Sequence, residues 1–425
     1  MTPPTRFLLA SAASALDTAN ALRPLDRFGP GASPGFATGV LTSEMPLHAA
    51  GAQAAVGLLL ARGGGLRGLR GLAGLALTAA SGVGLWRLYR DAQASQQVLE
   101  DALVEGLGPD YRDRIIGPYA LAPDVPLTRR SLLVPDLAAR RRYAARGDRD
   151  LAYGEFGRRN RLDVWHRTDL AADAGAPVLL QVHGGAWVMG QKQGQAHPLM
   201  AHLAERGWVC VTINYRLSPR STWPDHIVDV KRAIAWVRAT IADHGGNPDF
   251  LAITGGSAGG HLSSLAALTP NLAAYQPGFE DADTTVHAAV PFYGVYDFAG
   301  RSPSANRGLE SLLARQVFKT SLDDDRANWE LASPITHVGP DAPPFFVLHG
   351  TNDTVVPVEA AREFVAALRP VASTPVVYAE LPRAQHAFDA FPSVRVHHTV
   401  HAVERFLAVA RSRAGRPAAP VTLRG

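Results

Sequence analysis

Cysteine and lysine are scarce in this sequence, and the stretch between Met45 and Arg90 contains no acidic residue. Cys210 is the only cysteine among 425 residues, which excludes an internal disulfide, and its place in an expected strand favours a buried residue over a nucleophile. The few lysines and many arginines form no basic stripe with interleaved aromatic residues, so we do not expect nucleic-acid binding. With 47% hydrophobic and 19% charged residues, the chain should be globular, with one large core and further chain beyond it.

The excess of positive charge lies in one part of the chain. Residues 1–150 hold 17 arginines and 13 acidic residues, which accounts for the whole formal charge of +4, whereas residues 151–425 hold 25 basic and 25 acidic residues. A proline-punctuated connection and the run Arg140-Arg141-Arg142 separate the two parts. We therefore expect a helical N-terminal region at 1–150, a second domain at 151–413 and a flexible tail at 414–425.

No acidic residue occurs between Met45 and Arg90, where arginines interrupt two stretches of apolar and small residues, 46–61 and 71–86. Each stretch has about 16 residues, fewer than the roughly 20 that a helix needs to span a bilayer. The order of apolar stretch, arginine-rich turn and second apolar stretch predicts a membrane-associated helical hairpin at 46–90 with its basic loop on the cytoplasmic side. The alternative is a soluble helical appendage on a cytoplasmic protein, because small residues let helices pack closely in either setting.

A secretory signal is the weaker interpretation of the N-terminus. Arg6 precedes an apolar run at 7–15 that ends in small residues, as such signals require. The run has only about nine residues and modest hydrophobicity, so we expect membrane association rather than secretion.

Beyond residue 150, short apolar runs alternate with amphipathic stretches of helical length. Strands separated by such helices predict an α/β fold, with a mostly parallel sheet and helices on both faces. The expected strands are residues 161–166, 177–182, 208–213, 250–254, 286–293, 344–349 and 375–381. The expected helices are residues 195–205, 224–243, 260–268, 357–368 and 394–411.

The central motif lies between an expected strand and an expected helix, at residues 255–259. Its sequence, Gly-Gly-Ser-Ala-Gly, is the G-x-S-x-G pattern of a nucleophile elbow. In such an elbow the serine occupies a strained turn, and the flanking glycines remove the Cβ atoms that would clash there. We therefore expect the Ser257 hydroxyl to stand exposed at the carboxyl edge of the sheet, ready to act as a nucleophile. A glycine-rich tight turn with an incidental serine is the alternative.

A second glycine-rich loop, with the sequence His-Gly-Gly-Ala-Trp, follows another expected strand at residues 183–187. Acyl transfer builds negative charge on a carbonyl oxygen, and catalysis needs N–H donors aimed at that position. Paired glycines let the backbone turn its amides toward a substrate. Gly184 and Gly185, together with the amide of Ala258 after the nucleophile, are therefore the expected oxyanion hole. Taken alone, the loop fits an ordinary β-turn equally well.

An acid and a histidine should follow the serine along the chain. Asp353 and His386 each follow an expected strand on a loop, so both can reach the edge where Ser257 lies. In this hypothesis His386 accepts the Ser257 proton and later protonates the leaving group, while Asp353 fixes the imidazole tautomer. The competing acids are Asp389, which is only three residues from His386, and the acidic run at 323–325, which should face solvent.

Two histidines on an expected helix have a spacing that suits metal chelation. His397 and His401 lie four residues apart, but we identify no nearby carboxylate or cysteine to complete a site. No metal is therefore expected.

Four separated motifs in this order resemble the hormone-sensitive-lipase branch of the α/β-hydrolases. They are the loop at 183–187, the segment Asn214-Tyr215-Arg216-Leu217-Ser218-Pro219, the turn at 255–260 and the segments around Asp353 and His386. The longer run at 255–262, followed by Pro270-Asn271, is similar to actinobacterial carboxylesterases and lipases of the Lip type, in which an N-terminal extension with apolar helices also occurs. The resemblance covers roughly residues 153–411.

The resemblance implies a serine carboxylesterase or lipase that hydrolyses carboxylic esters through an acyl-enzyme, without a metal or organic cofactor. It implies Ser257, Asp353 and His386 as the triad, with the oxyanion hole assigned above. Many members have a third glycine where this chain has Ala186, which we expect to narrow the alcohol side of the site. The expected partners are a small-molecule or lipid ester and a membrane surface, and the oligomeric state is not determined by the sequence.

Aromatic residues at expected strand ends and loops are predicted to line the acyl or alcohol pocket, and the insert at 298–334 is predicted to contribute to a cap. These aromatic residues are Trp187, Phe292, Tyr293, Tyr296 and Phe388. Two other functions fit the same motifs. One is an amidase or arylformamidase, and the other is a non-catalytic ligand-binding protein, against which the retained His386 argues.

Overall fold

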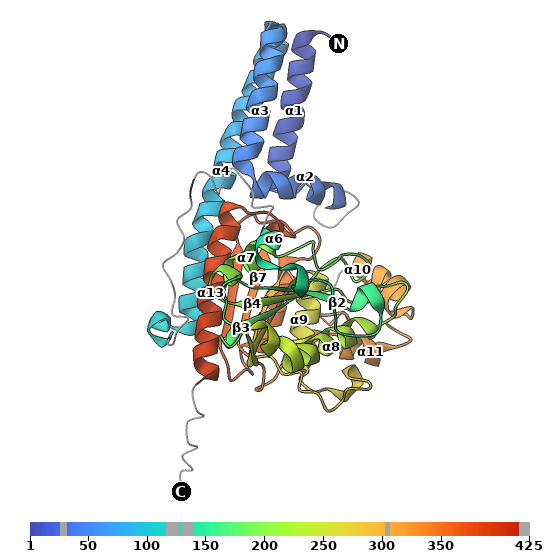
Figure 1. Cartoon of the computed structure of the whole chain (residues 1–425). Helices are drawn as coiled ribbons and strands as arrows, with labels where there is room; N and C mark the ends of the chain where they lie inside the picture. The colour runs from blue at the N-terminus through green and yellow to red at the C-terminus, as the bar shows by residue number, and fades with distance from the viewer. Residues whose placement is uncertain (26–31, 116–127, 129–138, 302–306, 416–425) are drawn as a thin grey trace.

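One sheet of eight strands forms the centre of the C-terminal part of the chain, in the order β1-β2-β4-β3-β5-β6-β7-β8 (Figure 1). The computed structural model describes residues 1–25, 32–115, 128, 139–301 and 307–415, so most of the expected tail and of the proline-punctuated connection lies outside the described residues. Strand β2 is antiparallel to β1 and β4, and the strands from β4 to β8 are parallel. The strands are β1 (Leu151–Ala152), β2 (Arg161–Trp165), β3 (Ala176–Val182), β4 (Val209–Ile213), β5 (Gly246–Gly256), β6 (Ala288–Phe292), β7 (Phe345–Gly350) and β8 (Val376–Leu381).

Helices cover both faces of this sheet. Alternate strand residues point to opposite faces, so Leu180 packs in one core cluster and Leu179 in the other. One face is covered by α8 (Asp225–Thr240), α9 (Ala258–Leu268) and α12 (Val358–Leu368), and the other by α7 (His197–Glu205), α13 (Val394–Ala414) and the C-terminal half of α4 (Gly68–Leu107). The remaining short helices are α6 (Ala139–Tyr143), α10 (Arg307–Leu312) and α11 (Arg326–Leu331).

The expected fold class is confirmed. All seven expected strands overlap observed ones, and the five expected helices correspond to α7, α8, α9, α12 and α13. The short edge strand β1 was not expected. Because parallel strands end at one edge, the loops after β3, β5, β7 and β8 meet there.

Helix α4 belongs both to the N-terminal region and to the α/β core. It continues without a break for 40 residues, beyond the expected apolar stretch. Leu99, Leu103 and Leu107 on its C-terminal half are buried in the core cluster that includes β8 and α13. A Cβ on Gly106 would lie 2.7 Å from Val377 Cγ2, so the helix backbone packs directly on the sheet.

Three helices project from the α/β domain as a bundle (Figure 1). They are α1 (Pro3–Leu22), α3 (Pro46–Leu60) and the N-terminal half of α4. The turn η1 (Ala61–Gly65) joins α3 to α4 at the far end, and α2 (Ala32–Glu44) lies at the base. Glycines allow the close approach of α1 and α4, because a Cβ on Gly74 or Gly84 would lie 2.6 Å from a side-chain atom of Phe7 or Thr18.

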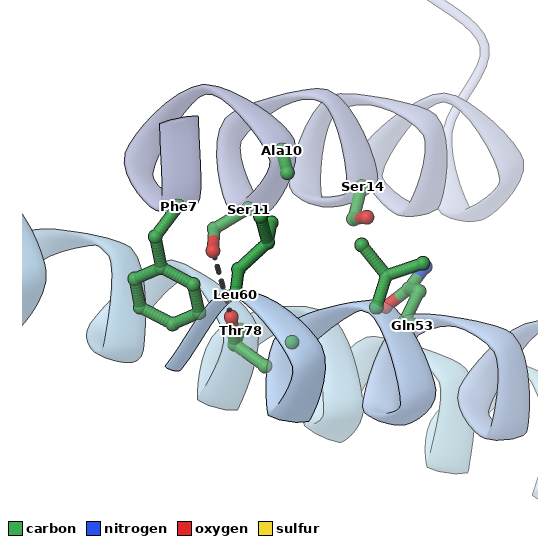
Figure 2. A pocket seen from close by; sticks show the side chains of 9 residues that line it. Phe7, Ala10, Ser11, Ser14, Gln53, Leu60 and Thr78 are labelled. Carbon is green, nitrogen blue, oxygen red and sulfur yellow. Dashed lines mark hydrogen bonds between the residues drawn. The ribbon is translucent and has the colours of Figure 1, made fainter. Parts of the chain in front are cut away.

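The interior of this bundle carries a line of polar side chains. Thr18 and Ser81 hydroxyls lie 2.8 Å apart, and the Ser81 hydroxyl lies 2.7 Å from Gln53 Oε1. Nearer the far end, Ser11 and Thr78 form a further hydrogen bond of 2.9 Å beside a small hollow between α1, α3 and α4 (Figure 2). Hydroxyl and amide groups therefore join the three helices from within.

Candidate active site

The turn between β5 and α9 holds Ser257 in an unusual backbone conformation, with φ 58° and ψ −121°. A Cβ on Gly259 would lie 2.1 Å from the Val182 carbonyl oxygen, and one on Gly255 would lie 2.5 Å from backbone atoms of Gly259. Larger residues therefore cannot occupy either position without moving the backbone. The expected strained strand-to-helix turn is present.

His386 and Asp353 lie next to each other at the same edge of the sheet. His386 Nδ1 is 2.7 Å from Asp353 Oδ2, and both side chains are buried. The other carboxylate oxygen, Oδ1, accepts hydrogen bonds of 2.8 Å from the amides of Val355 and Val356. This arrangement places the Nδ1 proton on the Asp353 side and leaves Nε2 for another partner.

The environment of Asp353 keeps its carboxylate ionised. Burial alone would raise the pKa of Asp353, but the charge of His386 and hydrogen bonds from His349 and His386 hold this pKa well below its usual range. His349 was not singled out from the sequence. It lies at the end of β7, and its Nε2 is 3.3 Å from Asp353 Oδ2.

Gln385 joins the acid loop to the histidine loop. Its Oε1 accepts hydrogen bonds from the amides of Thr354, at 2.8 Å, and of His386, at 2.9 Å. Gln385 was not singled out from the sequence, because no motif marks a side chain that accepts hydrogen bonds from backbone amides. Gln385 fixes the two loops relative to each other.

Tyr293 connects the serine turn to the histidine. Its ring centroid lies 4.6 Å from that of His386, and a Cβ on Gly256, next to Ser257, would lie 2.5 Å from the Tyr293 hydroxyl. That hydroxyl donates to Asp389, so the competing acid is paired with tyrosine rather than with His386. Asp323, in the other competing run, faces solvent.

The loop after β3 lies against the serine turn, as expected for an oxyanion hole. A Cβ on Gly184 would lie only 3.1 Å from Ser257 Cβ, and Gly185 has a φ of 123° that favours glycine. However, the Gly184 amide donates a 2.6 Å hydrogen bond to Gln195 Oε1. Gln195 was also missed, because no motif joins it to the loop. Gly185 and Ala258, the first residue of α9, are the two other candidate donors.

The aromatic residues expected to line the pocket are all buried. Trp187 Nε1 donates to His261 Nδ1 at 3.2 Å, and the ring of Tyr296 stacks on Phe364 at 4.2 Å. Phe292 and Phe388 pack against each other. The Tyr293 ring contacts that of His386, and the Phe292 carbonyl accepts a 3.0 Å hydrogen bond from the Ser257 amide. A lining role for the side chains of Trp187, Phe292, Tyr296 and Phe388 stays a prediction.

A carboxylate does lie beside the histidines of α13, which corrects the reasoning from sequence. Nitrogen atoms of His202 and His401 and a carboxylate oxygen of Glu404 lie within 4.8 Å of one another. Glu404 accepts a 2.7 Å hydrogen bond from His202 and lies 3.7 Å from Arg206. Burial opposes ionisation of Glu404, but hydrogen bonds from His202 and His401 lower its pKa to about 2. His202, Arg206, His401 and Glu404 form a cluster of hydrogen bonds and ion pairs that joins α7 to α13.

The fold and the order of the three loops define the protein as an α/β-hydrolase. The BD-FAE family profile matches residues 162–368. The chain is 50% identical to the probable carboxylic ester hydrolase LipM of Mycobacterium tuberculosis over 94% of this chain and 92% of that protein, and 50% identical to esterase LipQ of the same organism over 75% of each. The chain thus belongs to the Lip-type esterases, a hormone-sensitive-lipase-like branch, and it is a carboxylic ester hydrolase.

A solved structure agrees on the fold. The truncated form of a carbohydrate esterase from gut microbiota aligns with a TM-score of 0.50 and 21% identity, over 62% of this chain and 99% of that one.

Proposed function

We propose that Ser257, His386 and Asp353 form the catalytic triad of this ester hydrolase. The observation that carries the proposal is the 2.7 Å contact between His386 Nδ1 and Asp353 Oδ2 at the edge where Ser257 occupies its strained turn. The tautomer set by Asp353 leaves Nε2 of His386 unprotonated and able to take the serine proton.

The reaction then proceeds in two steps. Ser257 Oγ bonds to the carbonyl carbon of the ester while its proton moves to His386 Nε2, and the resulting oxyanion is held by the amides of Gly185 and Ala258. The carbon–oxygen bond to the alcohol breaks, and the alcohol leaves with the proton from His386. Water then gives one proton to His386 Nε2 while its oxygen bonds to the acyl carbon. The bond from the acyl carbon to Ser257 Oγ breaks, the acid leaves, and the proton on His386 returns to Oγ and restores the hydroxyl.

Gln195 occupies the Gly184 amide, the third candidate donor of the oxyanion hole. The Gly184 amide joins the oxyanion hole only if the Gln195 side chain turns away, since this amide donates to Gln195 Oε1 in the structure. Gly185 and Ala258 therefore supply the first two donors. A Gln195→Ala variant should keep activity, because it frees a donor rather than removing one.

A comparison of Ser257→Ala with wild type on p-nitrophenyl esters of increasing acyl length tests the triad. The variant should lose activity by about 10⁴-fold or more. Ser373→Ala is the matched control, because Ser373 is exposed and precedes β8 at the opposite edge of the sheet. Equal activity of wild type and Ser257→Ala would overturn the proposal.

We further propose that the projecting bundle is embedded in a lipid bilayer. Among the described residues, all but four of the large exposed apolar side chains precede residue 108, the exceptions being Phe156, Met189, Val355 and Val371. In α4 alone Leu72, Leu75 and Val83 are 61%, 51% and 71% exposed. Water-soluble proteins rarely expose a continuous apolar surface of this kind.

The interior of the bundle carries hydrogen-bonded polar side chains beside a small apolar cluster of Ala21, Leu85 and Leu88, while many large apolar side chains lie on its outside. The Thr18–Ser81–Gln53 hydrogen bonds and the glycine contacts between α1 and α4 lie in its interior. Helices in membranes associate in this way, through small residues and interhelical hydrogen bonds, because lipid offers no hydrophobic drive between them. Helix α4 is long and apolar enough to cross a membrane, and only 28% of its most apolar window is buried.

The ends of the bundle suit the two surfaces of a bilayer. Arg62 lies in η1, and Arg67 and Arg70 lie at the start of α4, so all three are at the far end. Arg87 and Arg90 lie within four residues of Asp91, which pairs with Arg383 at the base. Trp86 and Tyr89 also lie near the base, with ring centroids 5.5 Å apart, as aromatic residues do at membrane interfaces. The 20 residues from Gly68 to Arg87 span about 30 Å as a helix, the thickness of the hydrocarbon core.

Flotation of the full chain with phospholipid vesicles tests the embedding. Removal of residues 1–150 would also strip Leu99 and Leu103 from the core, so point variants are better suited. Leu75→Lys should reduce the floating fraction, since Leu75 is 51% exposed towards the middle of this span and a lysine facing lipid costs about 2.5–3.5 kcal/mol near the bilayer centre. Val371→Lys, at a side chain 43% exposed on the α/β domain, is the control. If the full chain stays in the unfloated fraction, the embedding is wrong.

A further inference from the structure

The base of the bundle is attached to the two loops that carry Asp353 and His386. Asn352 Nδ2 donates hydrogen bonds of 3.1 Å to the carbonyls of Ala21 and Leu22 at the end of α1. Arg383 donates to the Leu22 carbonyl at 3.2 Å and forms an ion pair with Asp91 of α4. The carboxyl edge of the sheet, where the site lies, therefore faces the bundle and the bilayer that surrounds it.

Helix α2 lies between the bundle and this edge (Figure 1). Phe36 on α2 approaches the His386 ring edge-on, with centroids 6.1 Å apart and an interplanar angle of 74°. Tyr293 contacts the same ring at 4.6 Å. The last residue of α2, Glu44, forms a buried ion pair with Arg395 of α13. A residue from the N-terminal region thus forms part of the surroundings of the catalytic histidine.

The exposed face of α2 continues the apolar surface of the bundle. Leu41 is 51% exposed, and Ala37 on the same helix is also exposed. Leu47, at the start of α3, adds a further exposed apolar side chain next to α2 in sequence. With the bundle embedded, α2 lies at the depth of the head groups, with apolar side chains toward lipid and Phe36 toward His386.

We propose that the enzyme takes its ester directly from the bilayer, and that Phe36 is a specificity-determining residue that contacts the long acyl chain as it passes α2 toward Ser257. This inference rests on the proposed triad and on the proposed embedding. The substrate class is a long-chain acyl ester that resides in the membrane. A short, water-soluble ester does not extend past His386 to Phe36 and gains nothing from it.

The experiment uses the full chain reconstituted in phosphatidylcholine vesicles. Two substrates are compared for each variant: p-nitrophenyl acetate in the aqueous phase and p-nitrophenyl palmitate dissolved in the bilayer. The readout is the ratio of kcat/KM for palmitate to kcat/KM for acetate, because a change that affects only folding or the catalytic groups alters both values equally.

Phe36→Ala should lower this ratio about 10-fold or more, since loss of an aromatic contact with a chain costs about 1–3 kcal/mol, and Phe36→Leu should restore most of it. Phe279→Ala is the control, because Phe279 is also half-buried but packs under Arg232 in a loop before β6. An unchanged ratio in Phe36→Ala, or an equal loss on both substrates, would overturn the role of Phe36. Failure of the triad would appear separately, as hydrolysis of both esters by Ser257→Ala, and failure of the embedding as loss of flotation.

Discussion

Glu44→Ala should destabilise the protein by about 3–5 kcal/mol, because it leaves a buried charge without its partner. Glu44, at the end of α2, and Arg395, on α13, are both fully buried and ion-paired. Ser393 Oγ donates to Glu44 at 2.9 Å, and Arg395 also donates to the Pro382 carbonyl at 2.9 Å. In Glu44→Ala the Arg395 guanidinium keeps its hydrogen bond to the Pro382 carbonyl but loses the Glu44 carboxylate, so its positive charge stays buried without a counter-charge.

The chain offers a matched control for this prediction. Glu105 of α4 forms a 2.8 Å ion pair with Arg369, so it too joins the N-terminal helices to the α/β domain, but the two side chains are 62% and 37% exposed. Exposed pairs contribute only about 0–1 kcal/mol, so Glu105→Ala should have a small effect. With an unfolding entropy of about 2.1 cal/mol/K per residue, Glu44→Ala should lower Tm by about 3–6 °C and Glu105→Ala by about 1 °C or less.

Thermal unfolding of the full chain in detergent micelles, followed by circular dichroism, measures these shifts. The double variant Glu44→Met with Arg395→Met should recover most of the lost stability, because it removes the unpaired charge and fills similar volume. If Glu44→Ala unfolds no earlier than Glu105→Ala, the pair does not hold α2 to the α/β domain. If the double variant is as unstable as the single one, the cost comes from packing and not from the charge.

Two further predictions concern the elbow and the buried histidines. Gly259→Ala should lower kcat/KM about 100-fold, because its Cβ would lie 2.1 Å from a backbone carbonyl oxygen and displace Ser257. Gly339→Ala is the control: its Cβ meets no atom within 4 Å, so this variant should keep its activity. Equal kcat/KM values for the two variants would contradict the prediction. Burial lowers the pKa of His183 to about 4 and the pKa values of His226 and His261 to about 3. These rings therefore stay neutral in the folded protein at a pH where the same histidines in the unfolded chain bind protons. The free energy of unfolding should consequently fall as the pH drops below about 6.5. Each histidine should contribute about 1.4 kcal/mol per pH unit down to its folded pKa, and urea titrations that show no slope between pH 6 and pH 5 would refute the effect.

The sheet could be predicted because its strands are short apolar runs with abrupt ends. β3 and β7 are buried at every position and are bounded by proline, glycine or polar residues, which gives a clear local signal. The turn at Ser257 was predictable for a similar reason, since only glycine fits at positions 255 and 259. The edge strand β1 has two residues and no comparable signal.

The N-terminal region was harder to predict because its contacts are made far along the chain. The expected hairpin at 46–90 corresponds to α3 and the first half of α4, but α1 packs beside them as a third helix. Leu99, Leu103 and Leu107 recur every four residues and are the signal that α4 continues into the core. From composition we assigned these leucines to the N-terminal region at 1–150, because the residues around them are polar.

The sequence places the candidate triad residues on the loops where the structure has them, but it does not mark the residues that support these loops. Asp353 and His386 follow strands in the expected order, whereas Gln385 and Gln195 act through hydrogen bonds to backbone amides that no sequence motif marks. Phe36 lies about 350 positions from His386, and only the fold shows that the two rings meet.

The most direct test of the central claim is to react the full chain with a fluorophosphonate and map the modified residue by mass spectrometry. Phosphonates form a stable bond to the activated serine of an ester hydrolase. One adduct per chain is expected, on Ser257, with loss of ester hydrolysis in proportion to labelling, and no adduct is expected in Ser257→Ala. An adduct on another residue that abolishes hydrolysis, or undiminished hydrolysis by the fully labelled protein, would contradict the claim.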